Sequence, residues 1–239
     1  MVGTIINALG ALFGGILGLV LKRQPDAAVQ SAAKGLIGIL LVWVGLAMTW
    51  VNVGGGLWLV LKQMIIVVLA LTLGRIVGRL LHMQKGMNRL GQFAREQFAK
   101  VEPGKRGRFG DGFLTCTILY CVTPLSFLGA IFDGLSGSWH ALGVKAVLDG
   151  FAAFSFSRVF GWPSLMAVLP LVAVQGTISL AMLPLGEWLR VHGLLESVGA
   201  TGGLLIFCVA MLVLDLRKVE VSDYLPALAF APALTWLWK

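Results

Sequence analysis

Charged side chains are scarce in this sequence, and their scarcity excludes an ordinary soluble domain. Asp, Glu, Lys and Arg make up 13% of the 239 residues and hydrophobic residues make up 58%, whereas soluble domains carry about a quarter charged residues. Apolar runs of roughly 20 residues, the length that crosses the hydrocarbon core of a bilayer, recur along the chain. The composition therefore predicts an all-α polytopic membrane protein surrounded by the lipid bilayer.

Cysteine and histidine are also few, at three residues each. The cysteines all fall in apolar segments and the histidines lie far apart, so their spacing predicts neither a disulfide framework nor a metal site. The sequence also lacks a P-loop, a GxSxG elbow and an HExxH motif, and no nucleophile is paired with a base. We therefore expect no metal, no cofactor and no enzymatic activity.

Hydrophobicity predicts about eight transmembrane helices. Some are expected to be broken or re-entrant, because Pro124 and polar residues interrupt the fourth and fifth and because the last two are short. The predicted spans are Thr4 to Leu21, Gly35 to Val51, Trp58 to Leu81, Phe113 to Phe132, Ala141 to Arg158, Pro163 to Leu185, Gly199 to Leu214 and Tyr224 to Trp238.

Lysine and arginine orient these spans, because cytoplasmic loops are enriched in both. With eight spans, most basic residues fall on one side, including Lys22, Arg23, Lys34 and the long loop after the third span. This side is predicted to be cytoplasmic, with both termini outside. The 19 basic residues against 11 acidic ones flank membrane spans, so nucleic acid is not an expected partner.

The long loop, residues 83–111, has the pattern of a basic amphipathic helix. Met87, Leu90, Phe93 and Phe98 lie near helical spacing with Lys and Arg between them. The prediction is a cytoplasmic interfacial helix that lies on anionic headgroups and fixes the topology. A gating or regulatory element is the alternative.

Two short motifs indicate an inverted repeat. Gly3-Thr4-Ile5 opens the first span and Gly176-Thr177-Ile178 lies in the sixth, and odd and even spans cross in opposite directions. Small-solute transporters are often built from such repeats. The predicted organisation is a three-span repeat at 1–82, the interfacial helix at 83–111, a central polar two-span element at 112–162 and the inverted three-span repeat at 163–239.

Glycine spacing predicts close helix packing. Gly10, Gly14 and Gly18 form two successive GxxxG steps on one face of the first span, where another backbone can approach closely. The stripe is interpreted either as internal packing or as a subunit interface. On the second interpretation we expect a homodimer with the first span near its two-fold axis.

Asp149 is the leading candidate for a functional residue. It lies near the middle of the fifth span, one turn after Lys145, and a carboxylate at that depth costs several kcal/mol unless it is paired, solvated or protonated. One interpretation is a water-filled path in which Asp149 binds a cation or a proton. The other is an i,i+4 ion pair that only locks the helix.

Further polar residues gather in the same segments, with Ser126 among them. A single hydroxyl in a span usually bonds to its own helix, but their concentration favours a polar path. Gln175 offers two donors and an acceptor, and Gly176 leaves its backbone accessible, which predicts a helix break that binds a neutral or ionic solute. The other path candidates are Thr4, Asn7, Thr115, Thr117, Ser155, Thr177 and Asp133, the last also expected as a turn residue beside Gly134.

Several motifs together carry a family resemblance. They are Gly3-Thr4-Ile5-Ile6-Asn7, the stretch from Phe113 to Leu135, Lys145 with Leu148-Asp149-Gly150, Gln175-Gly176, Gly202-Gly203 and Leu225-Pro226-Ala227. With these, most of the chain resembles the bacterial membrane proteins of domain-of-unknown-function family 554, the DUF-554 or YqgA/YdfK-like group. The resemblance implies a bacterial inner-membrane protein and assigns no activity or residue roles.

The leading functional prediction is a transporter of a small solute or ion, with a polar mid-membrane site near Asp149 and the Gln175-Gly176-Thr177 break. An ion or solute channel is the first alternative, since a channel needs a continuous wet path and a transporter two gated states. A membrane scaffold or sensor that does not transport is the second alternative.

Overall fold

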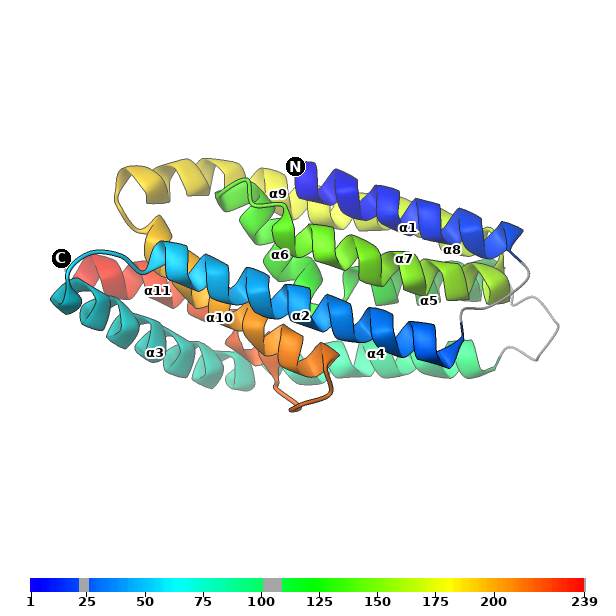
Figure 1. The fold of residues 1–239 in the computed structure, drawn as a ribbon, viewed down its shortest axis with the longest axis horizontal. Coiled ribbons are helices and arrows are strands. Elements are labelled where there is room, and N and C mark those ends of the chain that lie inside the picture. Colours follow the sequence, from blue (N-terminus) through cyan, green and yellow to red (C-terminus); the bar gives the residue numbers. More distant parts are fainter. Residues whose placement is uncertain (22–25, 101–108, 239) are drawn as a thin grey trace. The chain divides into compact units, whose positions relative to one another are not determined.

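The computed structural model describes residues 1–21, 26–100 and 109–238, and all regular structure in these ranges is helical (Figure 1). The all-α prediction is therefore confirmed for the described chain. The predicted cytoplasmic residues Lys22, Arg23, Lys105, Arg106 and Arg108 lie outside it. The helices are α1 (Val2–Val20), α2 (Ala27–Asn52), α3 (Leu57–Leu80), α4 (Met83–Ala99), α5 (Phe109–Cys121), α6 (Pro124–Leu135), α7 (His140–Phe160), α8 (Pro163–Met166), α9 (Val168–Val191), α10 (Leu195–Val213), the 3-10 turn η1 (Val221–Tyr224) and α11 (Ala227–Leu237).

The helices form two compact units that interleave along the sequence. Unit one comprises Met1–Ala33 and Met87–Met182, and unit two comprises Lys34–Gly86 and Leu183–Lys239. Unit one contains α1 and α5 to α8, and unit two contains α3, α10, η1 and α11, while α2, α4 and α9 contribute to both. The two predicted repeats, 1–82 and 163–239, do not coincide with these units. Each compact unit contains part of both predicted repeats.

Among the described residues, five helical segments are long and apolar enough to cross a membrane: α1, α2, α3, α8 with α9, and α10. The pair α5 and α6 meets the same criterion together, with a bend of 59° between its halves, which agrees with a broken fourth span. α7 contains Lys145, Asp149 and Arg158, and α11 has 11 residues. The chain is thus a multi-pass membrane protein with five or six candidate spans, and the eight-span count stays a prediction.

Unit one is built on close packing of α1 against α7. A Cβ atom at Gly10 would lie 2.6 Å from the Ala146 carbonyl oxygen, and one at Gly14 would overlap the Gly150 carbonyl. Gly3 lies beside Leu142, near the start of α7, so the two helices run parallel. The glycine stripe therefore packs inside the chain. The predicted homodimer loses its structural basis and stays a prediction.

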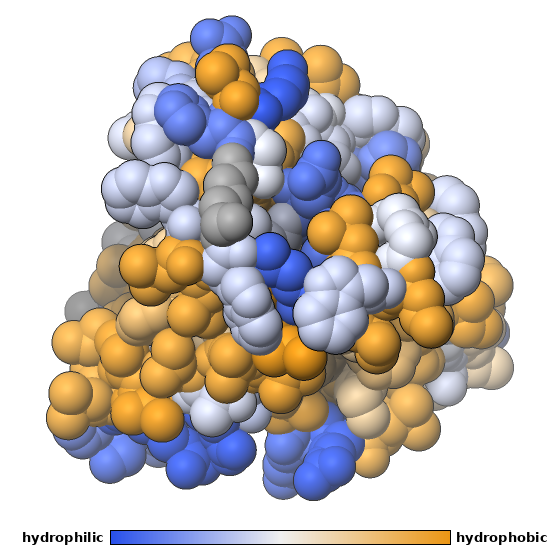
Figure 2. Space-filling view, turned by 90° about the vertical axis from the view of Figure 1, so that its left-hand side faces the viewer, coloured by the Kyte–Doolittle hydropathy of each residue, from blue (hydrophilic) through white to orange (hydrophobic). Residues whose placement is uncertain are grey.

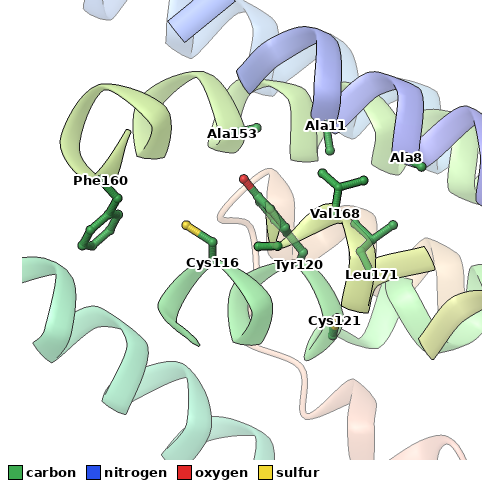
Figure 3. Packing of buried hydrophobic residues seen from close by; sticks show 10 residues of the cluster. Ala8, Ala11, Cys116, Tyr120, Cys121, Ala153, Phe160, Val168 and Leu171 are labelled. Carbon is green, nitrogen blue, oxygen red and sulfur yellow. The ribbon is translucent and has the colours of Figure 1, made fainter. Parts of the chain in front are cut away.

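Tyr120 lies at the centre of the apolar core of unit one. Its side chain points from α5 towards Ala11 of α1 and Ala153 of α7 (Figure 3). Val168 and Leu171 of α9 pack in the same cluster. The core thus joins α1, from the first sequence segment of unit one, to α5, α7 and α9, from the second. Its remaining buried members are Ala8, Cys116, Cys121, Phe160 and Ala167.

Unit two is built from two antiparallel helix pairs. A Cβ atom at Gly45 of α2 would lie 2.7 Å from the Gly203 carbonyl oxygen of α10. A Cβ atom at Gly74 of α3 would lie 2.5 Å from the Ala227 nitrogen at the start of α11. Gly residues are needed at these crossings because any side chain would separate the backbones.

The surface carries the large apolar side chains expected beside lipid. Figure 2 shows hydrophobic residues over much of the visible face, with hydrophilic residues gathered along its lower edge and in its upper part. Trp50 and Trp58 are 82% and 77% exposed. An open groove of about 780 Å³ along α1 and α7 is lined by apolar residues such as Phe13 and Phe151. Such a surface is stable in a bilayer and would be a liability in water.

α4 forms the predicted amphipathic helix over Met83–Ala99. Phe98, near its end, packs edge-on against Phe156 and Phe160 of α7, with ring centroids 5.6 Å apart in both pairs. At its start, the Gln84 N–H donates to the Asp223 carboxylate at 2.8 Å. The apolar face of α4 therefore docks on protein at Phe98, and its contact with a membrane surface stays a prediction.

Candidate functional site

A break between α5 and α6 frees a backbone carbonyl inside unit one. α5 ends at Cys121 and α6 begins at Pro124. In a continuous helix the Tyr120 carbonyl would accept a hydrogen bond from the N–H of residue 124, and proline has none. The Tyr120 carbonyl accepts instead from the Lys145 ammonium at 3.0 Å and from the Ser126 hydroxyl at 3.4 Å.

Thr123 begins α6 and helps to position Ser126. The Thr123 hydroxyl oxygen accepts a hydrogen bond from the Ser126 N–H at 3.2 Å, which is a side-chain N-cap. Pro124 takes the first helical position, where its missing N–H leaves no intrahelical bond unmade. The sequence Thr123-Pro124 thus ends one helix and starts the next at a defined angle.

The two charged groups of the site come from α7. Lys145 and Asp149, one turn apart, form an ion pair, and the residues are 1% and 6% exposed. Removing two ions from water costs several kcal/mol each, and their attraction offsets this only with additional hydrogen bonds. Neighbouring helices of unit one provide those bonds.

Asn7 and Gln175 connect the ion pair back to the helix break. The Asn7 side-chain N–H₂ donates to Asp149 Oδ2 at 3.1 Å and to Gln175 Oε1 at 3.2 Å, and Gln175 Nε2 donates to Ser126 Oγ at 2.8 Å. With the bonds to the Tyr120 carbonyl, these contacts close a ring of hydrogen bonds, here named the buried ring. Its members are Asn7 of α1, Tyr120 of α5 through its carbonyl, Ser126 of α6, Lys145 and Asp149 of α7, and Gln175 of α9.

Some buried polar atoms of unit one have no hydrogen-bond partner among the described residues. These atoms include Asn7 Oδ1 and the hydroxyls of Thr115, Thr117 and Tyr120. Asn7 and Tyr120 are fully buried, and an unsatisfied buried polar group costs about 1–3 kcal/mol. The Asn7 amide therefore holds an unused acceptor while its donor group serves the buried ring.

Asp133 forms a second polar contact, at the start of α1. Its carboxylate oxygens accept hydrogen bonds from the Gly3 N–H at 3.0 Å, the Thr4 N–H at 3.1 Å and the Thr4 hydroxyl at 3.0 Å. Ser179 of α9 donates to the same carboxylate at 3.4 Å. A carboxylate at a helix N-terminus satisfies free N–H groups and complements the helix dipole. Asp133 lies in the last turn of α6, and with Thr4 it joins α6 to α1.

Other predicted path residues lie outside the buried ring. The Ser155 hydroxyl donates to the Phe151 carbonyl of its own helix at 3.2 Å. Gly176 lies beside Met1, and Thr177 is exposed. The predicted break at Gln175-Gly176-Thr177 is wrong, because α9 runs without interruption from Val168 to Val191. One glycine in a helix costs only about 1 kcal/mol, and Gln175 beside it is held by buried hydrogen bonds to Asn7 and Ser126.

Sequence reasoning missed the contribution of the Tyr120 backbone. The signal was present, because any proline inside a span leaves the carbonyl four residues earlier without its helical partner. Counting back from Pro124 identifies residue 120. The prediction recognised Pro124 as an interruption but did not identify this acceptor.

The chemistry offered by the buried ring is mainly that of oxygen. It holds one carboxylate, one backbone carbonyl without a helical partner, two amide oxygens and a hydroxyl beside one ammonium. In the ranges that the structure describes, no group of three or more His, Cys, Asp or Glu residues could hold a metal ion. Such an oxygen-rich set suits hydrogen bonding to a solute or contact with a hard cation.

Comparisons with known proteins agree with a membrane protein. The chain is 26% identical over 245 residues to the uncharacterized protein YqgA of Escherichia coli strain K12, covering 100% of this chain and 97% of that protein. It is 23% identical over 237 residues to the uncharacterized membrane protein YdfK of Bacillus subtilis strain 168, covering 99% of this chain and 96% of that protein.

No solved structure matches the chain. A family model described as "Protein of unknown function (DUF554)" matches residues 2–236. This match covers nearly the whole sequence and includes every member of the buried ring, so the resemblance noted from the motifs is confirmed. The chain belongs to the DUF554 family.

Proposed function

We propose that this protein transports a small solute or ion across the bacterial inner membrane, with the buried ring as its binding region. The observation that carries the proposal is the ring itself: a charged pair and three uncharged polar side chains, all buried, meet at a helix break. Ionisable residues inside membrane helices are costly, and they commonly mark the path of an ion or substrate.

The position of the buried ring also supports transport. Lys145 and Asp149 are the sixth and tenth residues of the 21-residue helix α7, so a membrane-spanning α7 would hold Asp149 near mid-depth and Lys145 one turn away from it. Transporter sites typically lie at this depth and use discontinuous helices whose free backbone groups contact the substrate. The carbonyl of Tyr120 is such a group.

The contacts within the buried ring favour a transporter over a channel. Its side chains form hydrogen bonds with one another, so that they fill the site themselves. A solute could enter only if these contacts separated, which requires a second conformation. Alternating states are the defining property of a transporter, whereas a channel needs a continuous wet path.

Helix directions in unit one are consistent with the eight-span topology. α7 runs parallel to α1, while Gly112 of α5 lies beside Phe160 and Gly129 of α6 lies beside Leu142, so α5 and α6 run antiparallel to α7. Alternating spans one, four and five would have these directions. An even number of spans would place both termini on the same side, and the distribution of Lys and Arg assigns that side to the outside.

The predicted inverted repeat has similar support. It pairs the first span with the sixth, the second with the seventh and the third with the eighth. Asn7 of α1 bonds to Gln175, and Thr4 shares the Asp133 carboxylate with Ser179, so α1 and α9 are antiparallel in unit one. The α2 and α10 pair and the α3 and α11 pair are antiparallel in unit two. Opposed directions are required of helices related by an inverted repeat.

A ligand screen tests the proposal directly. Purified protein is heated in the presence of sodium, potassium, chloride, phosphate, amino acids, sugars and nucleosides, and a ligand of the folded state raises Tm. The ligands that stabilise the protein are then tested for uptake into proteoliposomes. We expect Asp149→Asn to abolish both responses. Asp111→Asn, the same change at an exposed residue of unit one, should leave both intact. Uptake that survives Asp149→Asn would contradict the proposal.

A further inference from the structure

We propose that the buried ring is a binding site for a monovalent cation and that the Lys145 ammonium occupies this site in the present conformation. This inference rests on the proposed transport function and names its substrate class. In the exchange we envisage, Lys145 leaves Asp149 when the cation arrives and returns when the cation departs. Lys145 would thus act as an internal competitor for the transported ion.

The contacts of the ammonium are those a bare cation would need. Lys145 Nζ contacts Asp149 Oδ2 and the Tyr120 carbonyl oxygen, the latter at 3.0 Å. The Tyr120 carbonyl lies at the C-terminal end of α5, where the helix dipole is negative. A carboxylate and a free carbonyl at a half-helix C-terminus are ligands that transporters use for Na⁺. Two oxygen ligands, from Asp149 and Tyr120, thus already surround a positive charge, that of Lys145.

The Asn7 amide can supply a third ligand and recruit a fourth. Its N–H₂ group lies between Asp149 Oδ2 and Gln175 Oε1, while its Oδ1 has no partner among the described residues. The two ends of an amide are similar in size, so a half-turn about the last side-chain bond exchanges them. The turned amide would place three oxygens from α1, α7 and α9 around one point. That arrangement is unfavourable without a cation and favourable with one.

The charge of the site selects a monovalent ion. Asp149 is the one carboxylate of the buried ring, and its other oxygen donors are neutral. A single negative charge balances Na⁺, K⁺ or Li⁺ and leaves a divalent ion undercompensated in a buried site. Oxygen ligands are also those that hard cations prefer.

Without the Lys145 ammonium, the site should need a cation from solution to balance Asp149. Lys145→Met keeps a long unbranched side chain but removes the ammonium, so Asp149 becomes a buried carboxylate without its counter-charge. We expect the variant to regain a counter-charge from solution. Its Tm should rise saturably with one of the alkali cations, by roughly 5–10 °C at a hundredfold excess over Kd.

The experiment compares Tm in LiCl, NaCl, KCl and choline chloride at equal ionic strength, at pH 6 and at pH 8. The intact protein, Lys145→Met, and the Lys145→Met, Asp149→Asn double variant are measured side by side. The inference requires an alkali-specific rise in the single variant, a much weaker one in the intact protein and none in the double variant. A single variant equally stable in choline and in every alkali salt would overturn it, because Asp149 would then be satisfied by a proton alone.

Two further outcomes are informative. If Lys145→Met can be purified only in one alkali chloride, that recovery supports the site; if it cannot be purified in any salt while the double variant can, the site is overturned. Asp149-dependent uptake of a solute by the intact protein, together with no cation response in Lys145→Met, would remove the cation site and leave transport standing. A cation response in Lys145→Met without uptake of any solute would support the cation site and contradict transport.

Discussion

The Lys145 ammonium donates a hydrogen bond to the Tyr120 carbonyl at 3.0 Å, across the gap between α7 and the end of α5. The bond exists because Pro124 cannot offer the N–H that would otherwise satisfy this carbonyl. A proline in one helix thus determines the acceptor available to a lysine in another. The charged pair on α7 and the helix break form one structural feature.

Pro124→Ala should weaken this link. Alanine restores an N–H at residue 124, so the Tyr120 carbonyl gains a helical partner that competes with Lys145. We expect the ligand-induced rise in Tm to fall several-fold, whereas the folded yield stays close to that of the intact protein. Pro232→Ala, inside α11 of unit two, is the matched control and should leave the ligand response unchanged. Equal responses from both variants would argue against a role for the freed carbonyl.

Removal of the two charges should be strongly non-additive. Lys145→Met or Asp149→Asn alone leaves one buried charge unpaired and should lower the free energy of unfolding by about 3–5 kcal/mol in a salt that supplies no counter-ion. The double variant should be much closer to the intact protein. Denaturation in choline chloride measures the cycle. Additive losses would show that the two charges do not depend on each other for stability.

Those charges were identified from the sequence because ionisable residues are conspicuous in apolar spans. Asn7 and Gln175 were also identified, and in the structure Asn7 donates hydrogen bonds to both Asp149 and Gln175. What the sequence could not determine is which polar residues share one site. Asp133 and Thr4 were placed on the same path as Asp149, but they form a separate contact at the start of α1. Hydrophobic periodicity predicts which face of its helix a side chain occupies, but it does not identify the residue on another helix to which that side chain bonds.

The helix break shows the same limitation. Gln175-Gly176-Thr177 and Thr123-Pro124 both interrupt an apolar span, and only the second interrupts the helix. Glycine weakens a helix by about 1 kcal/mol and proline by about 3 kcal/mol or more. The buried bonds from Gln175 to Asn7 and Ser126 are tertiary, so their stabilising effect on α9 was not visible from local sequence.

The glycine stripe allows a test of internal packing. Gly14→Ala would place a methyl group against the Gly150 backbone and should destabilise the protein by about 1–3 kcal/mol. Gly35→Ala, on α2 where no atom lies within 4 Å of the added methyl, should be neutral or stabilise by up to about 1 kcal/mol. Unfolding in denaturant measures both. A Gly14→Ala variant that folds normally but changes its cross-linked oligomer would return the stripe to a subunit interface.

Reporter fusions can test the topology from which the orientation of the buried ring follows. The eight-span arrangement places a fusion after Lys218, between α10 and α11, in the cytoplasm and a fusion after Glu196, at the start of α10, outside. A fusion after Lys105, which lies beyond the described residues, should also be cytoplasmic. Alkaline phosphatase and a fluorescent reporter give opposite signals on the two sides and control for expression. The decisive pair is Glu196 and Lys218, because α10 must cross the membrane completely if they differ. Reports from the same side would remove α10 as a span, and the antiparallel α2 and α10 pair would then no longer support an inverted repeat.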